Sequence, residues 1–233
     1  MKVAVIRFPG SNCDQDCHLV FREVGLEVDY VWHKETSVAG YDLLVLPGGF
    51  SYGDYLRCGA IARFSPVMQS VKAAAAAGTL VLGICNGFQI LCEAGLLPGA
   101  LIRNRDLHFR CEHRWVRVEN TANPYLHTST VGALLHLPIA HGEGCYVADA
   151  ETLAELNHSG RVLLRYTDAA GATNVAGNPN GSAENIAGIC NATRNVFGIM
   201  PHPERAADPQ LGSVDGRVIF ESVLATLRAT RAA

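Results

Sequence analysis

The sequence has few charged residues and no excess of either sign. Asp, Glu, Lys and Arg make up 18% of its 233 residues, against roughly 25% in an average soluble domain. Lys and Arg number 19 and Asp and Glu number 22, which gives a formal net charge of -3. Proteins that bind nucleic acid usually carry a basic patch. The composition therefore argues against a nucleic-acid partner, while 48% hydrophobic residues provide ample material for a buried core.

No long hydrophobic stretch is free of interruptions. Residues 73–92 are 20 consecutive uncharged residues, about the length that a helix needs to cross a bilayer. Glycines and polar side chains interrupt this stretch, and its composition changes from Ala-rich to Leu- and Val-rich within a few positions. Near the N-terminus, the apolar stretch 3–6 is too short for the hydrophobic part of a secretory signal. We therefore expect no membrane span.

The eight cysteines include no Cys-x-x-Cys pair. In a chain of this length without a secretory signal we expect reduced thiols and a cytoplasmic location. The closest approach to a metal-binding cluster is His108, Cys111 and His113. On an extended strand His108 would face away from the other two, so we expect no metal site. A Gly-rich phosphate loop with Lys and Ser or Thr is also lacking, so any ATP chemistry must belong to another chain.

Strands and helices alternate over the first hundred residues. Residues 3–8 predict a buried strand, 26–32 a second strand, 41–46 a third, and the fully apolar residues 79–84 a fourth. Helices are predicted around residues 17–24, in a segment ending near Phe64, and over 66–77 and 86–94, with Gly25, Gly78 and Gly95 as helix ends. This alternation indicates a mainly parallel sheet with helices on both faces.

The pattern changes in the second half of the chain. Residues 115–119 alternate in the manner of an exposed antiparallel strand, and Phe220, Val223, Leu224 and Leu227 have helical spacing near the C-terminus. Further short strands are predicted at 139–146, 161–167, 186–190 and 196–200. We find no internal repeat or linker, so we expect one α/β domain over residues 1–233, with antiparallel strands added in its second half.

Cys85 lies in a turn that is typical of a catalytic nucleophile. Gly83-Ile84-Cys85-Asn86-Gly87 places a cysteine between two glycines, after a predicted strand and before a predicted helix. A Cβ at Gly83 or Gly87 would crowd the neighbouring backbone of such a strained turn. The positive end of the helix favours a thiolate at Cys85. The alternative is an inert, buried cysteine in a Gly-rich turn.

A base and an orienting carboxylate follow the last predicted strand. In Pro201-His202-Pro203-Glu204 the two prolines are expected to hold the backbone extended, so that His202 and Glu204 project to the same side. Glu204 could then select the tautomer of the imidazole. Eight other histidines compete for the role of base.

An acyl-transfer site also needs hydrogen-bond donors for a developing oxyanion. The backbone N–H of Asn86, directly after the nucleophile, is one candidate. The turn Pro47-Gly48-Gly49 could supply another without steric hindrance, although it could equally be a plain turn at the end of a strand.

Together these segments resemble a known family. PGGFSYGD at 47–54, GICNGFQ at 83–89 and PHPE at 201–204 are similar to the three linked motifs of class I glutamine amidotransferases. More narrowly, the chain resembles the small glutaminase subunits of phosphoribosylformylglycinamidine synthase over nearly its whole length. This likeness rests on FPGSNCD at 8–14, YLRCGA at 55–60, HGEG at 141–144 and NPNGS at 178–182.

The resemblance implies a role for each matching residue. It makes Cys85 the nucleophile, His202 the base and acid, and Glu204 the group that orients His202. It places Gly49 and Asn86 in the oxyanion hole. The implied contacts to glutamine are Gly48, Phe50, Gln89, His141 and Glu143.

The resemblance also implies a fold, a reaction and partners. The fold is a flavodoxin-like α/β/α sandwich. The reaction is hydrolysis of glutamine to glutamate and ammonia through a thioester, with no cofactor in this chain. The ammonia passes to a large synthetase subunit that binds ATP and Mg²⁺ and amidates formylglycinamide ribonucleotide in purine biosynthesis, and a small third subunit bridges the complex.

Other interpretations stay open at this point. The chain could be a stand-alone cysteine hydrolase, a glutaminase that feeds a different synthetase, or a non-catalytic module of flavodoxin-like shape. Asn12 and Asp14 could cap the first helix or lie near an ammonia exit. His141 and Glu143 could contact glutamine or another subunit, or form an exposed loop.

Overall fold

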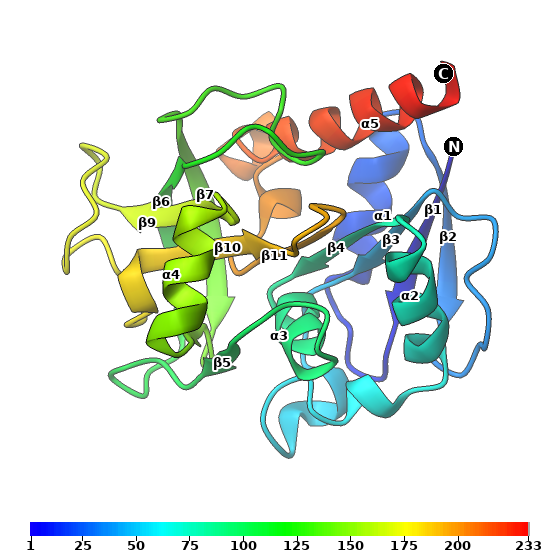
Figure 1. Cartoon of the computed structure of the whole chain (residues 1–233), viewed down its shortest axis with the longest axis horizontal. Helices are drawn as coiled ribbons and strands as arrows, with labels where there is room; N and C mark the ends of the chain where they lie inside the picture. The colour runs from blue at the N-terminus through cyan, green and yellow to red at the C-terminus, as the bar shows by residue number, and fades with distance from the viewer. Residues whose placement is uncertain (233) are drawn as a thin grey trace.

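A nine-stranded mixed sheet runs through residues 1–232, the part of the chain that the computed structural model describes (Figure 1). Its strand order is β2-β1-β3-β4-β11-β10-β9-β6-β7. The strands are β1 (Lys2–Arg7), β2 (Glu27–Trp32), β3 (Leu43–Leu46), β4 (Leu80–Ile84), β6 (Arg110–Val118), β7 (Leu134–His141), β9 (Val162–Thr167), β10 (Ile186–Cys190) and β11 (Val196–Ile199). A separate pair of short strands consists of β5 (Ala100–Ile102) and β8 (Cys145–Val147).

The sheet is parallel on one side and antiparallel on the other. Strands β2, β1, β3, β4 and β11 pair in parallel, and β10, β9, β6 and β7 continue the sheet in antiparallel pairs. All residues of β3 and β4 are buried, as expected for central strands with both faces covered. The predicted α/β fold with added antiparallel strands is thus confirmed.

Helices cover both faces of the parallel part (Figure 1). On one face α1 (Asp14–Glu23) packs on α5 (Arg217–Ala232), where the rings of Phe21 and Phe220 meet edge to face with centroids 5.0 Å apart. The other face carries α2 (Val67–Ala76) and α3 (Asn86–Glu93). One hydrophobic core includes residues from both halves of the chain, from Val3 to Leu227.

Some predicted elements differ from the structure. The strand expected at 139–146 is wrong, because a turn separates the end of β7 at His141 from the start of β8 at Cys145. The helical segment expected to end near Phe64 contains only two 3-10 turns, Ser51–Asp54 and Ala62–Phe64. Left-handed backbone at Tyr52, Gly53 and Asp54 prevents a regular helix there.

One α-helix and one strand were missed by the sequence analysis. Helix α4 (Ala150–His158) starts at Asp149, whose side chain accepts a hydrogen bond from the backbone N–H of Thr152 at 2.7 Å. This is an N-cap that the sequence does contain. Strand β5 has only three residues, which is too short for a recognisable pattern.

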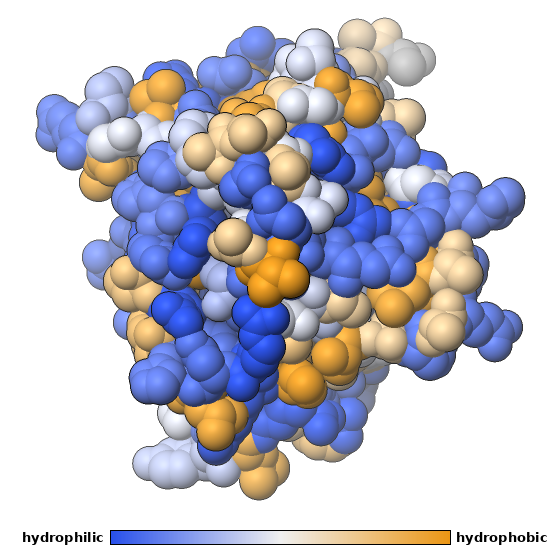
Figure 2. Space-filling view, turned by 90° about the vertical axis from the view of Figure 1, so that its left-hand side faces the viewer, coloured by the Kyte–Doolittle hydropathy of each residue, from blue (hydrophilic) through white to orange (hydrophobic). Residues whose placement is uncertain are grey.

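The face formed by the second half of the chain is mostly hydrophilic, with hydrophobic side chains scattered over it (Figure 2). Among the helices within residues 1–232, none is both long and apolar enough to cross a membrane.

Candidate active site

Cys85 occupies the sharp turn between β4 and α3. Its φ is positive, with φ 49° and ψ -104°, which is rare for a residue other than glycine. Gly87 lies so close to β3 that a Cβ would overlap the carbonyl oxygen of Leu46, and a Cβ at Gly83 would lie 2.8 Å from the backbone of Gly87. The two glycines are therefore needed for the reason predicted from the sequence. The strained turn lifts the cysteine out of the end of the sheet.

The Cys85 sulfur lies at the N-terminal end of α3 and beside the end of β7. Its Sγ is 3.7 Å from the carbonyl oxygen of Ala140, toward which the thiol donates. The side chain is buried, and the helix end favours negative charge at this position. A buried thiol at the N-terminal end of a helix is a candidate nucleophile.

His202 and Glu204 form a buried pair next to Cys85. Nδ1 of His202 is 2.6 Å from Oε1 of Glu204, and both residues are at least 97% buried. The route to this contact differs from the prediction, because Pro203–Arg205 is a turn of 3-10 helix and not an extended segment. The turn, rather than strand alternation, brings the carboxylate within hydrogen-bond distance of the imidazole ring.

The electrostatics of this pair favour an imidazolium. Burial lowers the pKa of His202, but the carboxylate of Glu204 and the neighbouring Cys85 sulfur more than offset it and raise that pKa to about 10. Within residues 1–232, Nε2 of His202 has no hydrogen-bond partner. This leaves the nitrogen free to exchange a proton with a bound reactant.

Gly48 and Gly49 border the site for different reasons. A Cβ at Gly48 would lie 2.7 Å from Cε1 of His202, so this glycine leaves room for the imidazole ring. Gly49 has φ 133°, and a Cβ there would lie 2.6 Å from the carbonyl oxygen of Gly10. Only glycine fits both the conformation and the close approach.

The backbone N–H groups of Gly49 and Asn86 are available as donors. Among the described residues, neither group has a hydrogen-bond acceptor. The two turns are tied together, because Oδ1 of Asn86 accepts a hydrogen bond from the backbone N–H of Ser51 at 3.2 Å. Unpaired donors on a rigid frame are what an oxyanion hole requires.

A chain of side-chain hydrogen bonds links Asn86, Gln89 and Glu143. Nδ2 of Asn86 donates to Oε1 of Gln89 at 2.9 Å, and Nε2 of Gln89 donates to the carbonyl oxygen of Glu143 at 2.6 Å. The carboxylate of Glu143 accepts from the backbone N–H of Cys58 at 3.1 Å and lies 3.8 Å from Arg103. Gln89 and Glu143, both predicted to contact glutamine, are therefore hydrogen-bonded to each other.

A cavity of about 170 Å³ opens beside His202. It is lined by Asn12, Cys13, Gly49, Phe50, Phe109, Ala140, His202 and Arg205. Phe50 and Phe109 stand at its mouth, with ring centroids 6.4 Å apart. A larger cavity of about 530 Å³ shares Arg205 with it and is also lined by Glu204, but neither Cys85 nor His202 lines that cavity.

The sequence analysis missed Cys13, Phe109, Ala140 and Arg205 as lining residues of this cavity. Arg205 donates to the sulfur of Cys13 at 3.1 Å and to Asp16 at 3.0 Å. Burial and the nearby Glu204 raise the pKa of Cys13 to about 12, so this residue stays a thiol. In the sequence, only the position of Arg205 directly after Glu204 could have indicated that it lies at this site.

Cys13, His202 and Glu204 are also the group of potential metal ligands that the described residues bring together, with ligand atoms within 4.8 Å. The hydrogen bond between His202 and Glu204 and the contact of Arg205 with Cys13 already engage these three side chains. His108, Cys111 and His113 do not belong to this group.

Asn12, Asp14 and His141 lie in different surroundings. Asn12 lines the cavity beside His202, whereas Asp14 pairs with Arg7 at 2.5 Å. Cys13 is the N-cap of α1, without a side-chain capping bond.

His141 is buried behind the active-site turn, and burial together with the nearby His202 lowers its pKa to about 4. It is therefore neutral near pH 7.

Comparisons with known proteins agree on one family. The model of the CobB/CobQ-like glutamine amidotransferase domain matches residues 1–217. The phosphoribosylformylglycinamidine synthase subunit PurQ of Acaryochloris marina is 58% identical over 230 residues, which cover 98% of each chain. The same subunit of Gloeobacter violaceus is 59% identical over 227 residues, which cover 97% of this chain and 98% of the relative.

Solved structures show the same likeness. A chain in the structure of PurLQS from Thermotoga maritima superposes with a TM-score of 0.87 at 42% identity, over 97% of this chain and 98% of that chain. The glutaminase domain of Trypanosoma brucei CTPS, which is 13% identical with a TM-score of 0.62, shares the fold.

Proposed function

The chain belongs to the CobB/CobQ-like glutamine amidotransferase family and, within it, to the PurQ subunits of phosphoribosylformylglycinamidine synthase, and we propose that Cys85, His202 and Glu204 are its catalytic triad. The chain is a glutaminase subunit that releases ammonia from glutamine for the synthesis of formylglycinamidine ribonucleotide. The observation that carries the triad is the strained Cys85 turn next to the buried pair of His202 and Glu204, whose atoms are 2.6 Å apart.

In the proposed mechanism the Cys85 thiolate attacks the side-chain amide carbon of glutamine. A C–S bond forms, and the negative charge that develops on the amide oxygen is held by the backbone N–H groups of Gly49 and Asn86. His202, kept protonated by Glu204, donates its proton to the amide nitrogen, and the C–N bond breaks to release ammonia. A thioester to Cys85 remains.

The second half of the reaction restores the enzyme. His202, now neutral, takes a proton from a water molecule, which attacks the thioester carbon. The C–S bond breaks, glutamate leaves, and Cys85 returns to the thiolate while His202 keeps the proton. Glu204 stays ionised throughout and holds the imidazole in position.

We further propose that Gln89, Glu143, Gly48 and Phe50 surround the bound glutamine. Phe50 lines the cavity beside His202, Gly48 lies against the His202 ring, and Gln89 donates a hydrogen bond to Glu143.

The ammonia must reach a partner. In the solved relative the homologous chain is part of PurLQS. We propose the same partners here, a large synthetase subunit and a small third subunit, with ATP and Mg²⁺ bound by the large subunit and no cofactor in this chain.

We also propose that residues 1–233 act as one domain, because one sheet and one core run through the described part. A cytoplasmic location is supported by eight free cysteines among the described residues.

The test is glutamate release by the complex of this chain with its synthetase partners, supplied with glutamine, formylglycinamide ribonucleotide, ATP and Mg²⁺. Cys85→Ala should abolish release, because no other thiolate occupies the turn. The matched control Cys111→Ala changes an exposed cysteine on β6 and should be fully active.

Persistent release by Cys85→Ala would refute the assignment of the nucleophile. A parent complex that uses free ammonia but not glutamine would refute the proposed function itself.

A further inference from the structure

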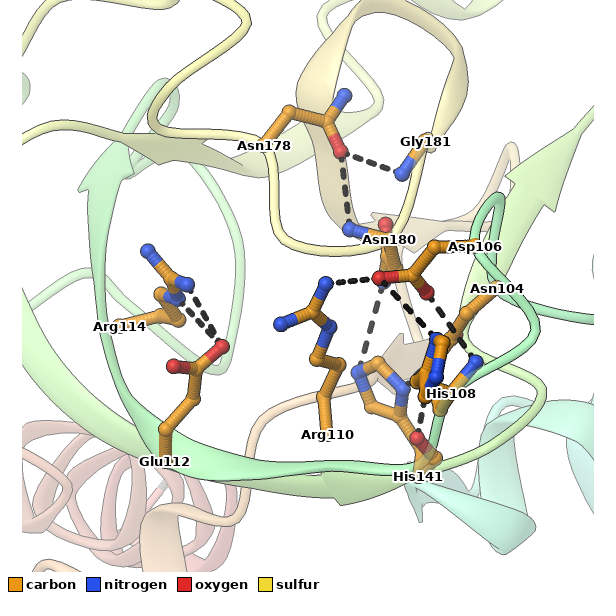
Figure 3. Close-up of polar contacts among 10 residues, drawn as sticks. All are labelled: Asn104, Asp106, His108, Arg110, Glu112, Arg114, His141, Asn178, Asn180 and Gly181. Atoms are coloured by element: carbon orange, nitrogen blue, oxygen red, sulfur yellow. Dashed lines mark hydrogen bonds and ion pairs between the residues drawn. The ribbon is translucent and has the colours of Figure 1, made fainter.

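Two sequence motifs, HGEG at 141–144 and NPNGS at 178–182, meet behind the active site. The turn His141–Gly144 begins at the last residue of β7, and the loop 178–182 precedes the 3-10 turn that leads into β10. Figure 3 shows His141 between Asn104 and Asn180, which reach it from two different loops. All three side chains are at least 97% buried.

Asn104 binds the turn at four points. Its Nδ2 donates to the carbonyl oxygen of His141 at 2.9 Å, and its Oδ1 accepts from the backbone N–H of Gly144 at 3.0 Å. The same Oδ1 lies 3.1 Å from Nδ1 of His141, and the backbone N–H of Asn104 donates to Gly142 at 2.9 Å. The amide therefore fixes both ends of the turn.

Asn180 closes the turn from the other side. Its Nδ2 donates to the carbonyl oxygen of Gly144 at 2.8 Å and lies 3.5 Å from Nε2 of His141 (Figure 3). Since Asn104 offers an acceptor to Nδ1 and Asn180 offers a donor to Nε2, only the neutral ring with its proton on Nδ1 satisfies both amides. A Cβ at Gly144 would overlap this ring, so ring and turn are packed against each other.

The turn held in this way touches the site on its outer side. The carbonyl oxygen of Glu143 accepts the hydrogen bond from Gln89 at 2.6 Å. The residue before the turn, Ala140, accepts from the Cys85 thiol at 3.7 Å. The hydrogen bond from Gln89 to Glu143 is shorter than the contact between Cys85 and Ala140, and Glu143 lies within the turn whereas Ala140 precedes it. A shift of the turn would therefore move Gln89 before it moved Cys85.

We propose that Asn104 and Asn180, acting through His141, are positioning residues that hold the turn 141–144 so that Glu143 fixes Gln89 against the bound glutamine. This inference rests on the proposed glutaminase function. It assigns His141 to the support of the site and leaves the contact with glutamine to Gln89 and Glu143.

The test replaces Asn180 by Asp in the full chain, assembled with its synthetase partners. The new carboxylate keeps the acceptor for Ser182, but it offers no donor to Gly144 or to Nε2 of His141 and repels the carbonyl oxygen of Gly144. Because the Nδ2 donor to both of these groups is removed, we expect the KM for glutamine to rise about tenfold and kcat to stay within roughly threefold. Alkylation of Cys85 by iodoacetamide, which does not depend on the glutamine-binding residues, should keep its rate.

Asn195→Asp is the matched control. The Nδ2 of Asn195 also donates to two backbone carbonyls, those of Ala75 at 2.8 Å and Thr79 at 2.9 Å, and its side chain is buried. It lies directly before β11, whereas His202 follows the other end of that strand. The two variants should lose similar thermal stability, while Asn195→Asp keeps the parent KM.

A KM within twofold of the parent for a folded Asn180→Asp would overturn the inference, as would an equal rise in Asn195→Asp or a parallel loss of alkylation. Cys85→Ala, measured alongside, separates this result from the proposed function. Glutamate release by that variant would refute the proposed nucleophile, whereas an unchanged KM in Asn180→Asp would leave it standing.

Discussion

Replacing Glu204 by Gln isolates the charge that keeps His202 protonated. The amide has the same shape and can still accept a hydrogen bond from Nδ1, which is 2.6 Å from the carboxylate in the parent. What disappears is the negative charge, and with it the main force that opposes burial and raises the pKa of His202 to about 10. The imidazolium becomes less stable, both before attack and while it donates to the leaving nitrogen.

The magnitude follows from the burial of the pair. A hydrogen bond to a charged group contributes about 1.5–3 kcal/mol, and bulk water does not screen this contact, because both side chains are at least 97% buried. At about 1.36 kcal/mol per tenfold change in rate, kcat/KM for glutamine should fall roughly 10- to 150-fold. The loss should appear mainly in kcat, since neither side chain is expected to hold the ground-state substrate.

The sign of the pH effect is also determined. Protonated His202 is the active form for attack, so activity falls as the pH rises through its pKa. Removing the charge of Glu204 lowers that pKa, and the alkaline limb of kcat/KM should move to lower pH. In the parent, this raised pKa contributes stability that is complete below about pH 6.5 and is lost as the pH rises toward 10. Glu204→Gln should flatten that part of the stability curve.

The assay is glutamate release by the assembled complex from pH 6 to 10, with Glu221→Gln as control. Glu221 is an exposed residue on α5, paired with Arg217, and its replacement should change nothing. A Glu204→Gln variant with the parent kcat and an unmoved alkaline limb would refute the argument that this carboxylate sustains the imidazolium.

Two further predictions concern stability. Gly87→Ala forces a Cβ into the carbonyl oxygen of Leu46, so β3 or α3 must move, and the melting temperature should fall by about 3–10 °C, the equivalent of about 1–3 kcal/mol. Gly142→Ala, whose Cβ would meet only Phe109 at 3.7 Å, is the control for calorimetry, and equal melting temperatures would contradict the steric argument. As the pH falls, His141 is protonated in the unfolded chain at a higher pH than in the folded chain, because its folded pKa is about 4. The parent should therefore lose on the order of 3 kcal/mol of stability between pH 6.5 and 4 through this group. In urea unfolding experiments, the free energy of unfolding of His141→Gln should depend less steeply on pH between 6.5 and 4 than that of the parent. Equal pH dependence in the two proteins would contradict the lowered pKa of His141.

The sequence alone determined the features that depend on neighbouring residues. Continuous apolar residues predicted β3 and β4, because central strands are buried on both faces, and the spacing of apolar residues predicted α1, α2 and α3. The Cys85 turn was equally local, since Gly83, Cys85 and Gly87 lie within five positions and the steric need for glycine follows from the sharp turn.

Tertiary structure decided how distant segments meet. The sequence placed His202 and Glu204 together, but for the wrong reason, because the 3-10 turn that joins them forms within the packing of β7, α1 and α5. The role of Arg205 depends on its contact with Cys13, 192 positions away. The support of the turn at His141 comes from Asn104 and Asn180, which are 37 and 39 positions distant. A single buried asparagine carries no periodic signal, because its partners are backbone groups that only the folded chain brings within hydrogen-bond distance.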